Sequence, residues 1–481
     1  MGLTFPISYW GLVAAIAATV LIDGLVRPRA LRSLRGLWLH LLVVTAFAGL
    51  VLAICGSILV AGCMVLALVA TFSLVSNAKR VVLGEPLLFT DLVLIGAVFR
   101  HPQFYLAALK RWQLAALWLG AAVLGLIIAW QFESDPLPHL AGLTLLLGSV
   151  GLLTITLALP PWRRMAQVPD ATADVAAHGL LATLLLYWWR WRAISDPPPS
   201  SEALPAEAKA ELVVVVQCES FADPAELFAD PDLALAGLTN ARQLAWAQGR
   251  LLVSGFGAYT MRTEYGLIFG REEHVLGFRR YDPYLTAVGE ASHALPARLG
   301  RAGWRSLFLH PHDLRFYNRH RILPAAGFAE LVGPEAFAEP AEGRYVTDDA
   351  VTDVILARAR EASGPTFIHA VTIENHGPWP VDQTSEHGVQ SGAYLRLVEK
   401  GDGMLHRLVT ELPTLGRPVA LVFYGDHRPS IPGAVVPGGD RHTPFVVLRF
   451  AADGTPISRP EAVQDMTPAE LHRALIEAIT A

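Results

Sequence analysis

Lysine is scarce in this chain of 481 residues: four of its 38 basic residues are lysine, which we attribute to compositional bias. Charge of either sign is also scarce, because charged residues make up 17% of the chain and the net charge is −5. This composition excludes a strongly basic surface, so we expect no nucleic-acid partner. The three cysteines, Cys55, Cys63 and Cys218, form no CxxC pair and no disulfide framework, and they leave the redox compartment open.

Long apolar runs are what the chain has in excess. Hydrophobic residues make up 53% of it, and most of the excess lies before residue 195. The runs are 8–26, 37–76, 113–130 and 139–159. As one helix, 37–76 would be about 60 Å long, twice the hydrocarbon thickness of a bilayer, so we interpret it as two spans that turn near Gly56–Ser57. We therefore predict a transmembrane domain over 1–194 with five strong spans.

The loops between these spans predict the orientation. The loops at 27–35 and 79–111 are basic, whereas the loop at 131–138 is acidic. The positive-inside rule then places the N-terminus outside and the basic loops in the cytoplasm. Five spans would leave the rest of the chain in the cytoplasm, and a sixth would place it outside. Residues 175–189 are a short candidate for this sixth span, and a helix lying on the membrane surface is an equally fair interpretation.

A Pro- and Ser-rich linker at 195–210 separates this domain from a second one at 211–481. In the second domain, four apolar runs each end in a polar cluster. The runs are 212–216, 306–309, 367–373 and 419–424. Helical patterns at 292–302, 347–362 and 391–412 lie between them. Strands that alternate with helices predict an α/β domain with a mainly parallel sheet.

The polar clusters contain residues that ligate metals. Because ligands bind beyond the carboxyl ends of parallel strands, we expect these residues to meet at one edge of the sheet. They are Glu219, His310, His376, Asp426 and His427. Two carboxylates with imidazole suit a divalent ion of the Mn²⁺ or Zn²⁺ kind. Each residue alone has an ordinary structural alternative, as a helix cap, a loop histidine or a turn, but their recurrence at four strand ends favours a metal site.

A candidate nucleophile lies in the glycine-rich segment 255–266. A helix is predicted to begin at Thr260, and a helix N-terminus favours an anion such as a phosphoryl group. A bound metal could activate the hydroxyl of Thr260. The structural alternative is that Thr260 is only an N-cap. Glu264, four residues further on, is expected to support the loop rather than to take part in the chemistry.

Together, these motifs resemble the lipoteichoic acid synthase-like phosphoglycerol transferases. That family includes the periplasmic glucan phosphoglycerol transferases and belongs to the alkaline phosphatase/sulfatase superfamily. The motifs, in the order found in the family, are Gln217-Cys-Glu219-Ser-Phe, the loop to Thr260 with Glu264-Tyr265, Phe316-Tyr317-Asn318-Arg319, Glu374-Asn-His376-Gly-Pro and Tyr424-Gly-Asp426-His427. The resemblance covers residues 210–450 and implies the fold of that superfamily for the second domain.

The resemblance also implies roles for individual residues. One divalent ion would be held by Glu219, Thr260, Asp426 and His427; Mn²⁺ is the expected ion, with Zn²⁺ or Mg²⁺ as alternatives. Thr260 would be the nucleophile. His310, Tyr317, Arg319 and His376 would contact the phosphate and the glycerol, and His376 would either protonate a leaving oxygen or bind phosphate.

The implied reaction transfers glycerol phosphate from phosphatidylglycerol, through an intermediate on Thr260, to a glycan or polymer hydroxyl. The family places its catalytic domain on the periplasmic, extracytoplasmic side of the bacterial inner (cytoplasmic) membrane, which favours the sixth span. The alternatives are a phosphoethanolamine transferase or phosphodiesterase of the same superfamily, or a membrane scaffold that has lost catalysis.

The chain departs from the family pattern in two places. Tyr317 stands where lipoteichoic acid synthases carry tryptophan, and Ala258-Tyr-Thr260-Met-Arg262 replaces their Gly-Lys-Thr-Ser-Asp pattern. The metal and nucleophile assignments survive these departures, but the donor head group is left open. The sulfatase signature Cys/Ser-x-Pro-x-Arg is absent around Thr260, which argues against sulfate-ester hydrolysis.

Overall fold

The computed structural model describes residues 7–93, 111–204, 208–338, 343–380, 390–459 and 463–481. The chain forms two compact units, Met1–Ile194 and Ser195–Ala481. Residues 94–110, which include much of the second predicted basic loop, and residues 205–207 of the predicted linker lie outside the described residues.

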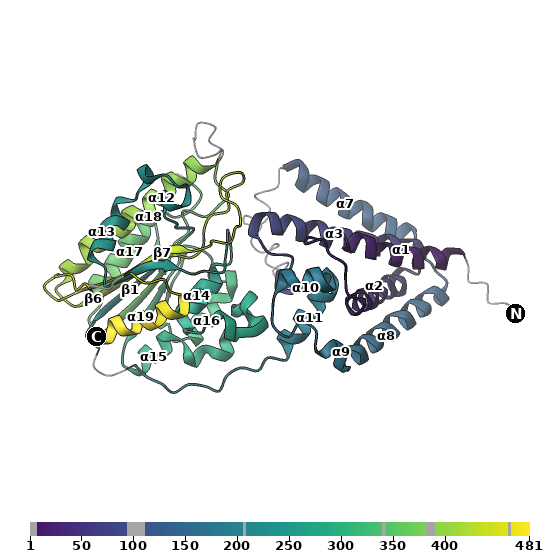
Figure 1. Ribbon diagram of the computed structural model, residues 1–481, viewed down its shortest axis with the longest axis horizontal. Helices are drawn as coiled ribbons and strands as arrows, with labels where there is room; N and C mark the ends of the chain where they lie inside the picture. The colour runs from purple at the N-terminus through teal and green to yellow at the C-terminus, as the bar shows by residue number, and fades with distance from the viewer. Residues whose placement is uncertain (1–6, 94–110, 205–207, 339–342, 381–389, 460–462) are drawn as a thin grey trace. The chain divides into compact units, whose positions relative to one another are not determined.

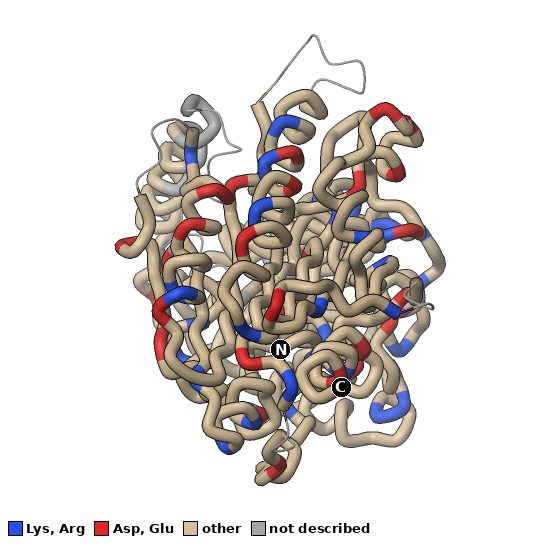
Figure 2. The backbone as a smooth tube through the Cα atoms, turned by 90° about the vertical axis from the view of Figure 1, so that its left-hand side faces the viewer, with Lys and Arg blue, Asp and Glu red and all other residues tan. Residues whose placement is uncertain are grey.

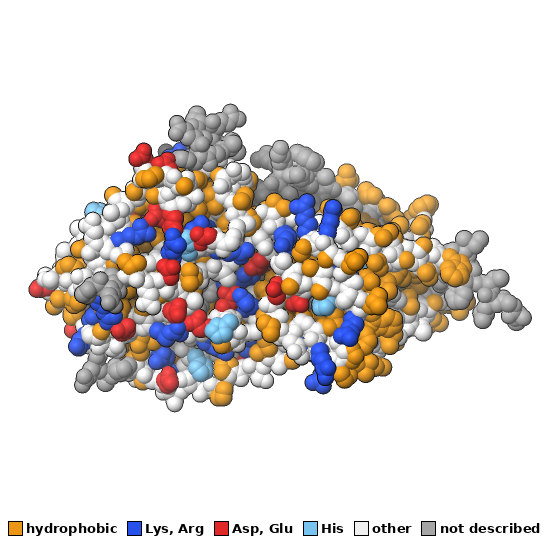
Figure 3. Space-filling view, viewed as in Figure 1, with side chains coloured by type: hydrophobic (Ala, Val, Ile, Leu, Met, Phe, Trp, Pro, Cys, Tyr) orange, Lys and Arg blue, Asp and Glu red, His pale blue; other side chains and the backbone are white. Residues whose placement is uncertain are grey.

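The first unit is helical. Its helices are α1 (Ile7–Asp23), α2 (Leu34–Cys55), α3 (Ile58–Leu83), α4 (Phe89–Val93), α7 (Arg111–Trp130), α8 (Pro136–Ala158), α9 (Pro160–Arg163), α10 (Ala171–His178) and α11 (Leu180–Arg192). Three of the described helices, α2, α3 and α8, are long and apolar enough to cross a membrane, and α1 and α7 contain shorter apolar stretches. Figure 3 shows hydrophobic side chains gathered on the outer surface of these helices. The described helices therefore agree with a membrane domain, and the number of spans stays a prediction.

The turn predicted between the second and third spans is present. Gly56 ends α2 with φ of 71°, and the side chain of Ser57 accepts a hydrogen bond from the backbone of Val60 at the start of α3. Helices α2 and α8 pack closely through glycines, because a Cβ added at Gly142 would lie 2.3 Å from the backbone nitrogen of Ala53. Small residues allow such close helix packing in membranes.

The candidate sixth span at 175–189 is divided between two helices. Gly179, with φ of 84°, separates α10 from α11. Helix α11 has 13 residues, which corresponds to about 20 Å. Its backbone is tied to the first helix, since Leu180 donates a backbone hydrogen bond to Asp23 at 2.9 Å. The sixth crossing and the side on which the second unit lies stay predictions.

The second unit contains a seven-stranded sheet in the order β2-β7-β6-β1-β5-β3-β4. The strands are β1 (Leu212–Cys218), β2 (Ala247–Leu251), β3 (Arg305–Leu309), β4 (Glu330–Val332), β5 (Thr366–Val371), β6 (Val419–Gly425) and β7 (Thr443–Phe450). The five strands from β6 to β4 are parallel, and β7 and β2 add antiparallel pairs at one side. The predicted α/β class with a mainly parallel sheet is confirmed, and β2, β4 and β7 are strands that the prediction did not include.

Helices cover both faces of this sheet (Figure 1). They are α12 (Pro224–Leu227), α13 (Ala236–Leu244), α14 (Thr260–Phe269), α15 (Leu295–Arg301), α16 (Arg319–Ala325), α17 (Asp348–Glu361), α18 (Ser391–Glu411) and α19 (Pro468–Thr480). Alternate residues of β1, such as Val214, Val216 and Cys218, join the apolar core formed with α13, α17 and α18. The residues between them face the layer that contains α14, as the period of two in a strand requires.

Short 3₁₀ turns connect these elements. They are η1 (Pro231–Leu233), η2 (Glu273–Tyr281), η3 (Pro283–Leu285), η4 (Ala287–His293), η5 (Phe316–Asn318), η6 (Pro334–Ala336) and η7 (Leu412–Leu415). Figure 2 shows acidic and basic residues interspersed along the chain. Some of them form ion pairs, as between Arg407 of α18 and Asp353 of α17 at 2.9 Å.

The described part of the predicted linker lies against the second unit. The backbone of Ser200 donates to the hydroxyl of Ser292 at 2.9 Å, and His293 donates to the carbonyl of Pro198 at 2.8 Å. Arg279 pairs with Asp196 at 2.7 Å. These contacts hold residues 196–200 of the predicted linker against the domain that they precede.

Candidate metal centre and active site

The sheet register brings the ends of two central strands together. Strands β1 and β6 pair so that Cys218 lies opposite Gly425, and the next residues in each strand direction are Glu219 and Asp426. Gly425 is required for this arrangement, because a Cβ at that position would lie 1.8 Å from the carbonyl oxygen of Phe221. The glycine at the end of the apolar run therefore lets the chain after β1 cross over the end of β6.

Three ligand atoms gather there, from Glu219, Asp426 and His427, all within 4.8 Å of one another. His427 Nε2 lies 3.5 Å from Glu219 Oε1 and 3.3 Å from Asp426 Oδ2. All three side chains are buried. The structure thus brings these three predicted residues together at one edge of the sheet.

Hydrogen bonds orient each ligand toward the common point. The backbones of Ser220 and His427 both donate to Asp426 Oδ1 at 2.9 Å, which leaves Oδ2 as a buried oxygen with no hydrogen-bond donor among the described residues. His427 Nδ1 lies 3.2 Å from the carbonyl oxygen of Arg428, so Nδ1 carries the proton and Nε2 offers its lone pair. The hydroxyl of Ser220 donates to Glu219 at 2.9 Å.

This cluster fits a cation. Its acceptor atoms face one another, and two carboxylates repel each other when no positive charge lies between them. Burial raises the pKa of Glu219 to about 8, and the neighbouring charge of Asp426 adds to this effect. A divalent metal ion would satisfy this donor set, which consists of the buried Oδ2 of Asp426, the Nε2 lone pair of His427 and the carboxylate of Glu219.

Thr260 is held beside this cluster by the chain on both sides of it. Before it, the backbone of Gly257 donates to the carbonyl of Arg428 at 2.8 Å. After it, the hydroxyl of Thr263 donates to the carbonyl of Asp426 at 2.8 Å. Residues three apart lie on the same helix face, so Thr260 faces the same end of β6 as Thr263. Thr260 is the first residue of α14 and is 8% exposed.

His376 approaches the cluster from the end of β5. Its Nδ1 donates to the carbonyl of Gly377 at 2.7 Å, so the neutral ring carries its lone pair on Nε2. Burial lowers the pKa of His376, and the charge of Asp426 offsets part of this effect. Tyr345 lies beside it, with ring centroids 5.8 Å apart. Burial raises the pKa of Tyr345 to about 12, and the charge of Glu219 adds to the increase.

Tyr345 was not predicted from the sequence. It follows Gly343-Arg344 in an irregular segment that no apolar run precedes, so no strand-end pattern pointed to it. The same holds for Ser220, whose φ of 52° turns the chain so that both its backbone and its hydroxyl reach the cluster. Its position directly after Glu219 was the one available indication.

His310 and Arg319 contact each other. The Nη1 atom of Arg319 lies 3.2 Å from His310 Nε2, and its Nε and Nη2 atoms donate to Glu264 at 3.0 and 2.5 Å. Arg319 is 1% exposed, so its guanidinium is enclosed by the protein. Tyr317 is half-buried, with its ring centroid 5.4 Å from the Arg319 guanidinium carbon. These three predicted substrate contacts thus belong to one buried network that also includes Glu264.

A second group of two acids and one histidine consists of Glu226, Asp440 and His442. His442 Nε2 lies 2.9 Å from Glu226 Oε1, and Nδ1 contacts Asp440. Here arginines already supply positive charge: Arg250 pairs with Glu226 at 2.5 Å, and Arg428 lies 3.6 Å from Asp440. This outer cluster is therefore an ion-pair network, and its charges are satisfied by the protein.

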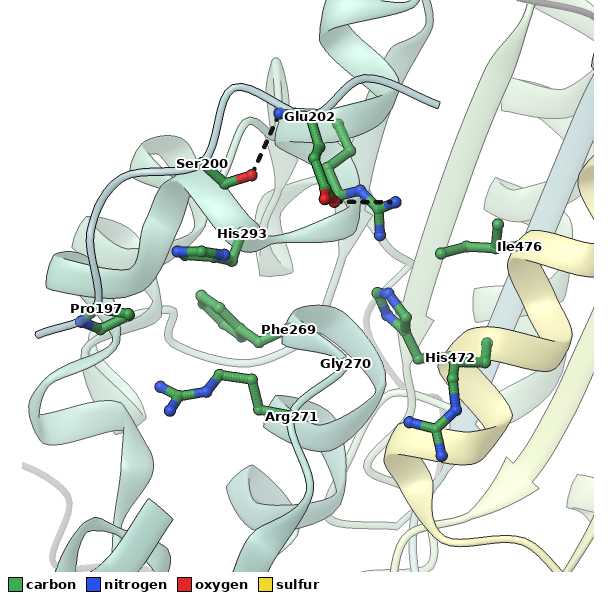
Figure 4. A pocket seen from close by; sticks show the side chains of 11 residues that line it. Pro197, Ser200, Glu202, Phe269, Gly270, Arg271, His293, His472 and Ile476 are labelled. Carbon is green, nitrogen blue, oxygen red and sulfur yellow. Dashed lines mark hydrogen bonds and ion pairs between the residues drawn. The ribbon is translucent and has the colours of Figure 1, made fainter. Parts of the chain in front are cut away.

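A cavity of about 430 Å³ lies at the opposite end of α14 from Thr260. Figure 4 shows His472 and Ile476 on one wall and Phe269, Arg271 and His293 on the other. Its arginines are paired with acids. The pairs are Arg271 with Glu290, Arg298 with Glu202 at 3.6 Å and Arg473 with Glu272 at 2.8 Å. Because it lies at the other end of α14, the cavity is separate from the cluster of Glu219, Asp426 and His427.

Comparison with known families identifies the second unit. The family model described as Sulfatase matches residues 211–468, which is more than half of the chain, and the chain belongs to this family. The match confirms the predicted membership of the alkaline phosphatase/sulfatase superfamily. That superfamily contains enzymes that transfer phosphoryl and sulfuryl groups, and the cluster of Glu219, Asp426 and His427 lies within the matched residues.

Several proteins are similar to this chain. A capsular polysaccharide biosynthesis protein, RkpI, of Rhizobium meliloti (strain 1021) is 28% identical over 442 residues, which cover 84% of this chain and 80% of that protein. Among solved structures, the Streptococcus pyogenes phosphoglycerol transferase GacH in complex with sn-glycerol-1-phosphate has a TM-score of 0.44 and 18% identity, and the match covers 56% of this chain and 75% of that one. The lipoteichoic acid synthase LtaP from Listeria monocytogenes has a TM-score of 0.45 and 16% identity, with 60% and 76% covered.

Proposed function

We propose that this protein is a metal-dependent phosphoglycerol transferase that moves glycerol phosphate from phosphatidylglycerol to the hydroxyl of a glycan or polymer. The observation that carries the proposal is the buried cluster of acceptor atoms from Glu219, Asp426 and His427 beside a helix that begins at Thr260. A helix N-terminus and a cation site together suit a phosphoryl group that is being attacked.

In the first step, the Thr260 hydroxyl oxygen forms a bond to the phosphorus of the lipid. The bond between phosphorus and the diacylglycerol oxygen breaks, diacylglycerol leaves with a proton, and glycerol phosphate stays esterified to Thr260. A divalent cation held by Glu219, Asp426 and His427, with Thr260 as a further ligand, would favour the alkoxide form of Thr260 and offset the charge on the phosphoryl oxygens. Mn²⁺ is the ion that we propose, with Zn²⁺ or Mg²⁺ as alternatives.

In the second step, an acceptor hydroxyl attacks the same phosphorus and loses its proton, and Thr260 is released. His376 is suited to carry protons at the site, because its Nε2 lone pair is fixed by the bond from Nδ1 to Gly377. Arg319, His310 and Tyr317 would contact the phosphate and the glycerol. The name of the capsular polysaccharide relative supports a glycan as the acceptor.

The lipid donor accounts for the membrane unit. A donor that stays in the bilayer must meet a catalytic domain that is anchored there, and α2, α3 and α8 can anchor it. We propose that the second unit faces the periplasmic, extracytoplasmic side of the bacterial inner membrane. Alkaline phosphatase fused after residue 481 checks this side, because the fused enzyme folds only outside the cytoplasm; an inactive fusion would contradict it.

The decisive experiment compares wild-type protein with Thr260→Ala in detergent micelles that contain fluorescent phosphatidylglycerol. We expect diacylglycerol release to fall by at least about 10³-fold, since the nucleophile is removed. Thr260→Ser keeps a hydroxyl and should retain measurable release, and Thr239→Ala, whose hydroxyl donates to the Leu235 carbonyl at 2.8 Å, should behave as wild type. Release by Thr260→Ala at the wild-type rate would refute the assignment.

The mass of the peptide that contains Thr260 separates the alternatives. Added glycerol phosphate supports the proposal, and added phosphoethanolamine after incubation with phosphatidylethanolamine identifies a phosphoethanolamine transferase. Lipid cleavage with water but with no glycan acceptor identifies a phosphodiesterase. A protein that holds no metal and cleaves no lipid would instead be a membrane scaffold.

A further inference from the structure

Glu264 is the centre of a buried polar network one helical turn after Thr260. It accepts two hydrogen bonds from Arg319, at 3.0 and 2.5 Å, and one from the hydroxyl of Tyr284 at 2.7 Å. Glu264 is 0% exposed, Tyr284 is 2% exposed and Arg319 is 1% exposed. Because residues four apart share a helix face, α14 carries Thr260 and Glu264 on the same side.

The charges in this network are matched to each other. Burial alone would raise the pKa of Glu264, but the guanidinium of Arg319 outweighs it and lowers this pKa below its ordinary value. Burial alone would also lower the pKa of Arg319, and the carboxylate of Glu264 raises it instead. Both groups are therefore ionised. Removing one partner would leave an uncompensated buried charge, which is strongly unfavourable.

The network also determines the form of His310. A guanidinium can only donate hydrogen bonds, so the Arg319 Nη1 atom, 3.2 Å from His310 Nε2, makes that nitrogen an acceptor. The other ring nitrogen, Nδ1, lies 3.0 Å from the carbonyl oxygen of Val371 and therefore carries the proton. Burial lowers the pKa of His310 well below its ordinary value, and the charge of Arg319 adds to this effect. His310 is thus a neutral ring with both nitrogens engaged.

We propose that Glu264 is a positioning residue for phosphoryl transfer. It fixes the guanidinium of Arg319 relative to Thr260, which lies on the same helix as Glu264. Through Arg319, it also holds His310 in the neutral Nδ1–H form. Among the described residues, Glu264 and His310 engage three of the five N–H groups of Arg319, which leaves one on Nη1 and one on Nη2 for phosphate oxygens. This inference rests on the proposed function, in which Arg319 contacts the phosphate.

The chain offers a matched control in a second buried network of the same composition. Glu290 is 1% exposed and accepts from the hydroxyl of Tyr265 at 2.6 Å and from Arg279 at 3.1 Å, with Arg271 as a further partner. Both networks therefore combine a buried glutamate, a tyrosine hydroxyl and arginine. A loss that comes only from disrupting a buried ion pair should appear equally in both.

The test compares Glu264→Gln with Glu290→Gln in the full-length protein, using release of diacylglycerol from phosphatidylglycerol and thermal unfolding. We expect both variants to unfold at lower temperature, and only Glu264→Gln to lose roughly 10- to 100-fold in kcat with little change in KM. Glu264→Asp, which keeps the charge, should recover part of the loss. An equal loss of kcat in Glu290→Gln would overturn the proposal.

A double-mutant cycle tests whether Glu264 acts through Arg319. Arg319→Lys keeps the positive charge but cannot form the two-point contact. If the proposal holds, adding Glu264→Gln to Arg319→Lys lowers kcat by less than about 2-fold further, because the shared interaction is already lost. If the two substitutions instead lower kcat by independent factors that multiply in the double variant, the proposal is overturned.

A spectroscopic readout separates this inference from the proposed function. In ¹⁵N-histidine spectra, the signals of His310, identified by their loss in His310→Asn, should show the neutral Nδ1–H form in the wild type and should shift in Glu264→Gln but not in Glu290→Gln. If the wild type releases no diacylglycerol, the proposed donor is wrong and these spectra still decide the positioning role. Unchanged His310 signals in Glu264→Gln would overturn it.

Discussion

Two clusters in the second unit contain the same chemical groups, two carboxylates and one histidine, yet they differ in what surrounds them. The inner cluster, Glu219, Asp426 and His427, is buried, and no arginine of the described residues forms an ion pair with it. The outer cluster is Glu226, Asp440 and His442. Its acids are exposed, and arginines pair with both of them.

Residue type alone does not make a metal site. Fixed cations of the protein already satisfy the outer acids, and exposed pairs of this kind contribute little to stability. The inner acceptors have no arginine or lysine partner in the part of the chain that the structure describes, and a buried charge without a partner is costly. The divalent cation that we propose for the inner cluster would remove this cost.

The largest expected difference is in metal content and activity. Glu219→Gln should lose most of the bound metal and roughly 10³-fold in diacylglycerol release, because several kcal/mol of transition-state stabilisation depends on the cation. Glu226→Gln should keep the wild-type metal content and activity within about 3-fold, since its charge is already paired with Arg250. Metal analysis of the purified proteins, before and after dialysis against a chelator, makes the comparison. Equal metal loss in the two variants would mean that the clusters do not differ as described.

A smaller effect, on the free energy of unfolding, is expected when a glycine next to each cluster is replaced by alanine. Gly425→Ala should lower the free energy of unfolding by about 1–3 kcal/mol, because the new methyl group would collide with the backbone of Phe221. Gly438 lies in the loop before Asp440, and a Cβ there would meet nothing within 4 Å, so Gly438→Ala should change the free energy by less than about 0.5 kcal/mol. Denaturant unfolding in detergent measures both. Similar values would show that the chain after β1 does not cross the end of β6 as closely as the structure has it.

The smallest effect is the pH dependence of the outer cluster. Burial alone would raise the pKa of Glu226, but its hydrogen bond with His442 and the charge of Arg250 lower it below its ordinary value. The folded pKa is depressed, so this stabilisation is present above the unfolded pKa of about 4.3 and is lost as pH falls through the folded pKa. Wild-type protein should therefore exceed Glu226→Gln in stability by less than about 1 kcal/mol at pH 7, with no difference at pH 3. A difference that grows on acidification would have the opposite sign and would contradict this assignment.

The sequence predicted the central part of the fold well. The apolar runs before Glu219, His310, His376 and Asp426 are the four adjacent parallel strands β1, β3, β5 and β6. The prediction succeeded because a strand buried on both faces is apolar throughout, and the carboxyl ends of parallel strands meet at one edge. Strands β2 and β4 contain few apolar residues, and β7, although it has eight residues and an apolar run at 445–448, was not predicted because no cluster of metal-ligating residues follows it.

The site could be predicted only in part, for a different reason. Glu219, Asp426 and His427 follow strands directly, so strand order was enough to bring them together. Tyr345 reaches the site from an irregular segment, and its approach depends on how that segment packs. The enclosure of Arg319 by Glu264 was not predicted either, because α14 and α16 meet through tertiary packing between residues 55 positions apart.

By itself, the sequence determined the four central strands and the long apolar helices of the first unit, since a continuous apolar run is a local property of the chain. Tertiary structure alone decided which of two chemically similar clusters is enclosed and which is balanced by arginine. It also decided that Glu264 holds Arg319 while Glu290 holds Arg279. These choices depend on which side chains are removed from water together, and burial of that kind exists only once the chain has folded.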